Sequence, residues 1–187
     1  MARKGYVYKG VTYDSNEEIE FLQWLEEAQM LGMVQKWIYQ PKSFELCSKV
    51  TVDEMIQLKT KKKAVQRSLL QSHKYTADFK IWFTEDINKF NTELKNLNLL
   101  YNRLIYIDIK GGFNSRGSHS NFSVESKWVW DKYKILVEKV IPEKFFKATW
   151  VPELVRITPK RHEIKKKYDK GFKTFENIAE LILNENK

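Results

Sequence analysis

Cysteine is almost missing from this chain of 187 residues, in which Cys47 stands alone. A single cysteine excludes an intrachain disulfide and a zinc site built from several cysteines, and it fits a reducing compartment. As a catalytic thiol, Cys47 has no evident partner in the sequence. We expect it to be a small, partly buried apolar side chain.

Long apolar runs are missing too. No stretch approaches the roughly 18 apolar residues of a membrane span, and Met1 to Gly5 lacks the apolar core of a secretory signal. The glycines of residues 111–117 do not lead into Gly-Lys-Ser or Gly-Lys-Thr, as a nucleotide-binding loop would require. We therefore expect an intracellular, cytoplasmic protein with no membrane partner and no nucleotide cofactor.

Acidic residues are outnumbered, with 24 Asp and Glu against 33 Lys and Arg, giving a formal net charge of +9. An excess of this size favours a polyanionic partner, and nucleic acid above all. Hydrophobic residues make up 42% of the chain, which suffices for one core at this length. We expect one domain over residues 1–187, with a basic insertion at about 51–72 and a basic C-terminal extension at about 156–187.

The first half of the chain carries clear element patterns. Residues 6–13 predict a short hairpin that turns at Lys9-Gly10. Residues 16–30 predict a helix that follows Ser15 and stops at Gly32. Residues 34–46 predict strands interrupted at Gln40-Pro41, which implies an edge or a bend.

The second half is less regular, and its patterns leave several alternatives. Residues 51–72 form a basic excursion without glycine or proline, and 86–102 fit either a helix or a long loop. The remaining expectations are a glycine-rich loop at 111–120, a helix within 122–140, strands at 145–150 and 154–157, and a terminal amphipathic helix at 175–183. The order of elements predicts an α/β (α+β) fold, with a central mixed β-sheet flanked by helices.

Two apolar segments each carry one acid, and both acids require an explanation. Residues 75–79 and 105–112 look like strands that contain Asp78 and Asp108. A buried carboxylate is costly unless a metal, a cation or hydrogen bonds compensate it. Lys110 lies two positions after Asp108 and so shares its face of the strand. Alternatively, both acids have a purely structural role, in which Asp78 caps a turn and Asp108 forms an ordinary ion pair with Lys110.

An acid on one strand followed by Asp108-x-Lys110 on the next resembles the PD-(D/E)XK nuclease superfamily, in its small phage-encoded endonuclease type. The resemblance spans residues 6–150, although Thr76-Ala77 replaces the proline of the named motif. It implies a restriction-endonuclease-like core and a Mg²⁺ ion, with Mn²⁺ as a substitute. Asp78, Asp108 and the Ile109 carbonyl would hold the metal, and Lys110 would position or deprotonate the attacking water.

The resemblance also implies a glutamate from the first helix, three residues after a serine. Glu18 fits this position after Ser15, and it is a candidate catalytic residue and metal ligand. The same spacing is a capping box, in which Glu18 would reach back to the Ser15 amide. Both roles stay open, with Glu20 as the reserve candidate. By the same resemblance Gln40 could lie near the metal, although a strand-end glutamine is usually structural.

Several basic residues are candidates for contact with a phosphate backbone: Arg116, Lys127, Lys61, Lys62 and Lys63. Any one of them could equally be a solvated surface side chain. Together with the acids, they predict a Mg²⁺-dependent DNA endonuclease. Selectivity for branched or junction DNA and assembly into a homodimer both stay open. The alternatives are a non-catalytic nucleic-acid-binding protein and an RNA-directed nuclease.

Overall fold

The computed structural model describes residues 5–84, 104–112 and 116–185, without the side chains of 116–120 and 184–185. Its helices are α1 (Asn16–Met30), α2 (Arg116–Tyr133), α3 (Pro142–Ala148), α4 (Glu153–Arg156) and α5 (Phe175–Glu185), with a 3₁₀ turn at Lys166–Tyr168. Its strands are β1 (Tyr6–Tyr8), β2 (Val11–Tyr13), β3 (Val34–Tyr39), β4 (Phe44–Cys47), β5 (Val50–Gln57), β6 (Lys62–Leu70), β7 (His73–Tyr75), β8 (Phe79–Phe83), β9 (Leu104–Ile109) and β10 (Val137–Val140).

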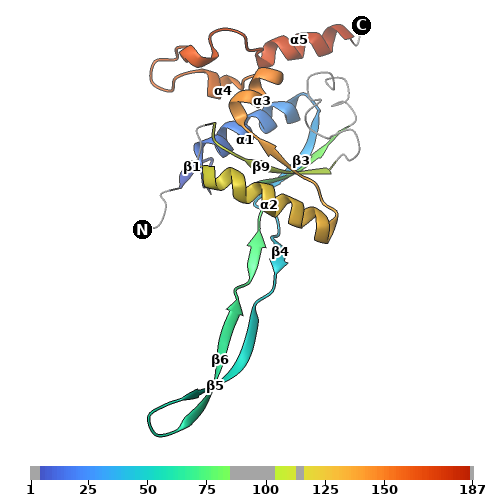
Figure 1. The fold of residues 1–187 in the computed structure, drawn as a ribbon. Coiled ribbons are helices and arrows are strands. Elements are labelled where there is room, and N and C mark those ends of the chain that lie inside the picture. Colours follow the sequence, from blue (N-terminus) through green and yellow to red (C-terminus); the bar gives the residue numbers. More distant parts are fainter. Residues whose placement is uncertain (1–4, 85–103, 113–115, 186–187) are drawn as a thin grey trace.

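A four-stranded sheet in the order β10-β9-β8-β3 forms the centre of the molecule. Strands β10 and β9 run parallel, whereas the β9–β8 and β8–β3 pairs are antiparallel. Helix α1 lies on one side of this sheet with α3 and α4, and α2 lies on the other side (Figure 1). The structure confirms the expected mixed α+β architecture, with a mixed central sheet flanked by helices.

Helix α1 begins and ends where local chemistry requires. The Ser15 hydroxyl accepts a hydrogen bond from the Glu18 amide at the N-cap. At the other end, the Gly32 amide donates to the Gln29 carbonyl and the Met33 amide donates to the Ala28 carbonyl. Gly32 has a φ of 75°. This is a Schellman motif, in which glycine takes the left-handed conformation without a Cβ penalty.

The sheet separates two apolar clusters. The larger cluster lies on the α1 side, and α1, β8, β9, α3 and the C-terminal segment contribute to it. The smaller cluster joins Phe44 and Leu46 of β4 to Phe122 and Val129 of α2. Alternation along β9 directs Ile105, Ile107 and Ile109 to the larger cluster. The other face of β9 therefore carries Asp108.

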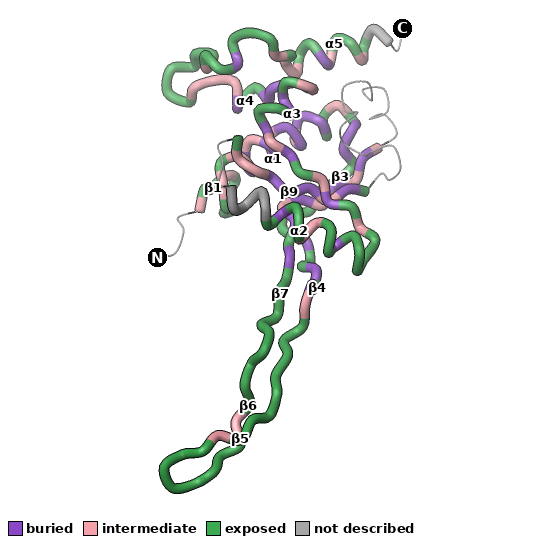
Figure 2. Tube along the Cα trace, in the orientation of Figure 1, coloured by how far each residue is buried: buried purple, intermediate pink, exposed green. Residues whose placement is uncertain are grey.

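The basic insertion expected at about 51–72 is a long two-stranded ribbon. Strands β5 and β6 pair antiparallel from Val50 opposite Leu70 to Gln57 opposite Lys62. The turn closes with a hydrogen bond from the Leu58 amide to the Lys61 carbonyl. The ribbon projects away from the sheet (Figure 1), and almost all of it is exposed (Figure 2).

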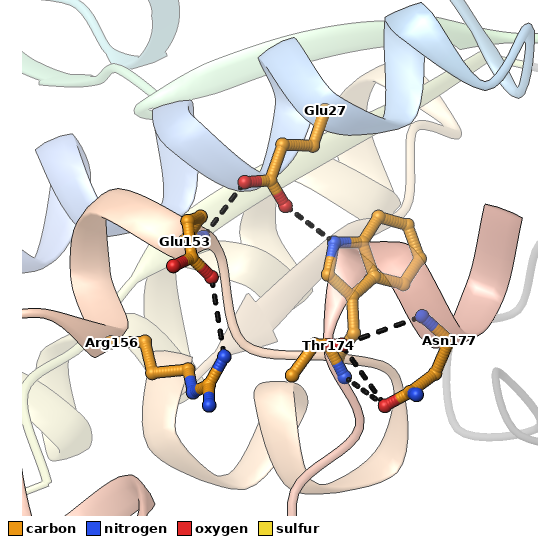
Figure 3. Close-up of polar contacts among 6 residues, drawn as sticks. Glu27, Glu153, Arg156, Thr174 and Asn177 are labelled. Atoms are coloured by element: carbon orange, nitrogen blue, oxygen red, sulfur yellow. Dashed lines mark hydrogen bonds and ion pairs between the residues drawn. The ribbon is translucent and has the colours of Figure 1, made fainter. Parts of the chain in front are cut away.

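The C-terminal segment packs back onto α1. Trp150 is fully buried, and its indole N–H donates to Glu27 Oε2 at 2.7 Å. Glu27 Oε1 accepts the Glu153 amide at 2.8 Å, so one α1 carboxylate fixes the start of α4 (Figure 3). Farther along, Thr174 exchanges hydrogen bonds with Asn177 at the start of α5 (Figure 3). Tyr168 and Ile178 join the larger apolar cluster.

Several expected element boundaries are wrong. Residues 145–148 lie in helix α3, so the strand expected at 145–150 is wrong, because Pro142 starts a helix well and Phe145 and Phe146 are both buried on it. Residues 153–156 form helix α4, so the strand expected at 154–157 is wrong as well.

The glycine-rich loop ends early, because helix α2 already begins at Arg116. The same helix ends at Tyr133, and 137–140 form strand β10. Residues 75–79 are not one strand, since β7 ends at Tyr75 and β8 begins at Phe79. The segment 86–102 lies outside the described residues. Among the helices that the structure describes, none has the length and apolar character needed to cross a bilayer.

Candidate active site

Asp78 and Asp108 meet where the start of β8 lies beside the end of β9. Asp78 directly precedes β8, and Phe79 pairs with Ile107 of the antiparallel β9. The Ile109 amide donates to Asp78 Oδ2 at 2.5 Å, and the Gln40 amide donates to the Asp78 carbonyl at 2.8 Å. Two neighbouring backbone segments therefore hold the half-buried Asp78 in place.

Asp108 is buried beside Lys110. Its side chain is only 5% exposed, and Oδ2 lies 2.5 Å from Lys110 Nζ in an ion pair. This contact lowers the pKa of Asp108, against the effect of burial. Lys110 also approaches the ring of Phe122 on α2 at 6.0 Å from its centroid. Lys110 therefore offsets part of the cost of burying the Asp108 charge.

The two carboxylates work against each other electrostatically. Burial, and then the charge of Asp108, raise the pKa of Asp78 to about 8, against an opposing effect of the Ile109 amide. Burial also raises the pKa of Asp108, while the Lys110 ammonium lowers it. Like charges that share a buried site favour protonation or a bound cation. Perturbation of this kind is typical of functional sites.

Glu18 is buried at the start of α1, and hydrogen bonds hold both of its oxygens. Oε1 accepts from the Ser15 hydroxyl at 2.8 Å, whereas Oε2 accepts from the Tyr39 hydroxyl at 2.7 Å and the Asp14 amide at 3.2 Å. Its charge still contributes to the raised pKa of Asp78. Within the described ranges, no three His, Cys, Asp or Glu side chains gather closely enough to hold a metal. The structure thus brings Asp78, Asp108 and Lys110 together without adding Glu18 as a third clustered ligand.

None of the other predicted residues with a described side chain bonds to Asp78 or Asp108 through that side chain. Lys127 is exposed on α2, and Arg116 is the first residue of that helix, with its side chain among those not described. Lys61, Lys62 and Lys63 lie at the far end of the ribbon. Gln40 is exposed, and its side-chain amide donates to Asp14 rather than to Asp78 or Asp108.

Sequence reasoning missed residues that surround Asp108. The Tyr75 hydroxyl is buried without a hydrogen-bond partner among the described residues, and burial followed by the Asp108 charge raises its pKa. Glu125 of α2 also adds to the raised pKa of Asp108. His73 Nε2 lies 2.9 Å from Glu125 Oε1, and its ring stacks near Trp128. No spacing in the sequence connects these residues, because the fold alone places α2 over β7 and β9.

The first glycine after Lys110 has a steric reason to be there. A Cβ built on Gly111 would lie 3.1 Å from Glu17 Oε1. The chain leaving β9 therefore passes close to the first turn of α1, where a side chain would push against Glu17. The glycine lets Lys110 and the start of α1 lie close together.

Comparison of the chain with models of protein families, with curated proteins and with solved structures finds no match. The chemistry of the site must therefore be argued from its own residues. A buried pair of carboxylates beside an ammonium can bind a divalent cation, exchange a proton, or remain a structural ion pair.

Proposed function

We propose that this protein is a Mg²⁺-dependent endonuclease that hydrolyses phosphodiester bonds in DNA. The observation that carries the proposal is the pair of the half-buried Asp78 and the buried Asp108, in which the Asp108 charge raises the pKa of Asp78 and Lys110 lies 2.5 Å from Asp108. A structural ion pair needs only one acid and one base. The second buried acid is what a cation site explains.

The oxygen atoms of Asp78, Asp108 and the Ile109 carbonyl are of the kind that Mg²⁺ binds. Mg²⁺ keeps several waters and commonly takes only one or two protein carboxylates, so Asp78 and Asp108 suffice. Asp108, whose Oδ2 contacts the Lys110 ammonium, is the carboxylate ligand from β9 in this proposal. The Ile109 amide points to Asp78, and the carbonyl of a strand residue points to the same side as its amide. The Ile109 carbonyl is therefore the third protein ligand in this proposal.

Such an ion, when bound, lowers the pKa of water and stabilises charge on the phosphate. The chain itself supplies Lys110, whose ammonium can hold a water or a phosphate oxygen beside Asp108. The Lys110 side chain is 20% exposed, so its ammonium can contact solvent although most of the side chain is buried. Glu18 keeps the start of α1 rigid through its three hydrogen bonds, and it adds negative charge near Asp78.

The proposal includes a restriction-endonuclease-like core. It is supported by the adjacency of β8 and β9 at the centre of the sheet, with one acid at each strand. Contact with DNA is supported by the net charge of +9. Mn²⁺ would serve as a substitute for Mg²⁺ in the same site.

The test compares the parent with Asp108→Ala on supercoiled plasmid and on a four-way DNA junction. We expect cleavage by the parent in Mg²⁺, none in chelator, and none by Asp108→Ala, which should still bind DNA. Asp131→Ala is the matched control, because Asp131 is an exposed acid on α2 whose side chain is 85% accessible. It should cleave like the parent.

Equal cleavage by Asp108→Ala and the parent would refute the assignment. Binding without cleavage by every variant would favour the non-catalytic nucleic-acid-binding protein. Cleavage of ribose-containing strands alone would identify an RNA-directed nuclease.

A further inference from the structure

The β5–β6 ribbon has no partner within the described chain beyond its own two strands. Along both strands only Ile56 and Val65 are even half-buried. Met55 is 63% exposed, and Leu69 and Leu70 are more than half exposed. The ribbon is the largest exposed element of the molecule (Figure 2). It positions neither Asp78 nor Asp108.

A two-stranded ribbon alone in water is marginally stable. One face carries Val52, Ile56 and Val65 among the charged Glu54, Lys63 and Arg67, and the other carries Met55 opposite Ala64. The apolar side chains on each face are few, and charged side chains stand among them on the first face. Charge is therefore the main feature that a partner of the ribbon would meet.

The charged side chains of the ribbon are mostly basic. Residues 50–70 contain five basic side chains against two acidic ones, a net charge of +3. One of the acids, Glu54, already forms an ion pair with Arg67 at 3.5 Å. The remaining basic residues gather at the tip: Lys59, Lys61, Lys62 and Lys63. Successive residues of β6 point to opposite faces, so Lys62 and Lys63 present charge on both sides of the ribbon.

The root of the ribbon is basic too. A cavity of about 720 Å³ opens there between β4, β7, β8, β9 and α2, and Lys42, Lys74 and Lys80 line it together with Tyr106 and Tyr133. The Lys80 ammonium lies 5.3 Å from the centre of the Tyr106 ring. Tyr106 and Asp108 share one face of β9. Basic side chains therefore gather at two places, at the root of the ribbon near the candidate active site and at its tip, with Asp53, Glu54 and Arg67 between them.

We propose that the ribbon lies in a groove of duplex DNA and holds its phosphates at a distance from the cleavage site. The eight residues of β5, at a rise of about 3.4 Å each, make the ribbon roughly 27 Å long. The major groove, about 12 Å wide, admits a two-stranded ribbon. Basic side chains on both faces then meet the two phosphate walls of the groove.

The choice of DNA as the partner rests on the proposed function. The ribbon adds to that function by naming duplex DNA as the substrate class. The ribbon supplies affinity and position, whereas Asp78, Asp108 and Lys110 supply chemistry. The other occupant to be tested is a second copy of this chain. Like charges at two paired tips oppose that arrangement, so we argue for DNA.

The first test is a binding titration without cleavage, in chelator and again in Ca²⁺, by fluorescence anisotropy. It compares Lys62→Gln/Lys63→Gln with Lys144→Gln/Lys147→Gln, a matched pair of exposed lysines on α3, on the other side of the sheet from α2 (Figure 1). On a duplex of roughly three helical turns, the ribbon pair should weaken binding about tenfold. It should also reduce the slope of log affinity against log salt by about 1 to 2.

A second variant removes the tip. Residues 55–64 are replaced by Asn-Gly, which joins the directly opposed Glu54 and Val65 through a two-residue hairpin turn. It should fold with the melting temperature of the parent, because no apolar cluster includes the deleted residues. On a duplex shorter than one turn, parent and shortened chain should bind nearly equally, and the difference should appear only on longer duplex.

Unchanged affinity and salt slope in both ribbon variants would overturn the proposal. So would conversion of a dimeric parent to a monomer by the deletion with DNA affinity intact, since this would assign the ribbon to a second copy. Failure of the proposed function looks different. In that case the ribbon variants lose binding as expected, while no sample cleaves DNA in Mg²⁺.

Discussion

The residue that decides most about this protein is Asp78. Its carboxylate has a good hydrogen bond from the Ile109 amide, yet burial and Asp108 raise its pKa to about 8. A carboxyl group with a pKa near neutrality can exist in either protonation state under ordinary conditions. The state of this site therefore depends on pH and on cations.

Stability should reveal this dependence. The folded pKa of Asp78, about 8, lies above its ordinary value of 3.8. The folded state therefore binds the proton more tightly, and this contribution to stability is complete below about pH 4 and lost as the pH rises towards 8. Without divalent cations, the parent should unfold at a progressively lower temperature across this range.

Asp78→Asn should remove much of that loss, since the amide carries no charge while its oxygen can still accept from Ile109. The variant should melt above the parent at pH 8 and near it at pH 4, by differential scanning calorimetry in chelator. Mg²⁺ should raise the melting temperature of the parent at pH 8 but not that of the variant. A parent curve that is flat with pH would contradict the shared buried charge.

At the scale of elements, local sequence was decisive where a cap or a turn fixed the backbone. The hairpin β1–β2 and helix α1 form as predicted, and the Ser15 cap and the Gly32 stop are both confirmed. Glu18 accepts from the Ser15 hydroxyl and the Asp14 amide instead of the Ser15 amide. The local pattern fixed the start of the helix, whereas the donors to Glu18 depended on the fold, which adds the Tyr39 hydroxyl.

The Schellman motif gives a prediction with an internal control. Gly32→Ala should reduce the free energy of unfolding by about 1 kcal/mol, because alanine is strained at positive φ. Gly112→Ala has no such strain, and its Cβ would meet only Ile141 at 4.0 Å. It should leave stability unchanged or slightly higher. Equal losses in both variants, measured by urea unfolding, would argue against the left-handed turn as the cause.

Strand expectations failed where an apolar pattern was short. Residues 145–150 contain Phe145, Phe146 and Trp150, whose spacing fits either a strand or a helix. Contact with α1 selected the helix, since the Phe145 ring packs edge-on against Trp24 at 4.7 Å between centroids. Short apolar runs leave this choice to the tertiary structure.

At the scale of the whole molecule, one buried carboxylate connects the first helix to the C-terminal segment. Glu27 is 8% exposed, and it accepts from the Trp150 indole and the Glu153 amide. Burial raises its pKa, while these two donors lower it. The contact joins residues more than 120 positions apart.

Glu27→Ala should therefore destabilise the whole fold by about 1 to 3 kcal/mol, because it leaves the buried Trp150 indole N–H and the partly buried Glu153 amide unpaired. Met30→Ala is the control on the same helix, since Met30 is 69% exposed, and it should cost little. Urea unfolding would measure both values. A single transition at lower urea is expected for Glu27→Ala, whereas unfolding of the C-terminal segment alone would show that it is not part of the same cooperative unit.

The sequence by itself determined the fold class, the first helix and its caps, the edge strand before Pro41, and the two acids with Lys110. These follow from local periodicity and turn chemistry, which act over a few residues. Only the tertiary structure decided that Asp78 and Asp108 repel each other, that Glu18 is held by Tyr39, and that Glu125 lies near Asp108. It also decided that the basic excursion is a projecting ribbon. The features of the site depend on contacts between segments far apart in the chain, and no local pattern encodes such contacts. The ribbon pairs two neighbouring segments, but its direction away from the sheet is set by the rest of the fold.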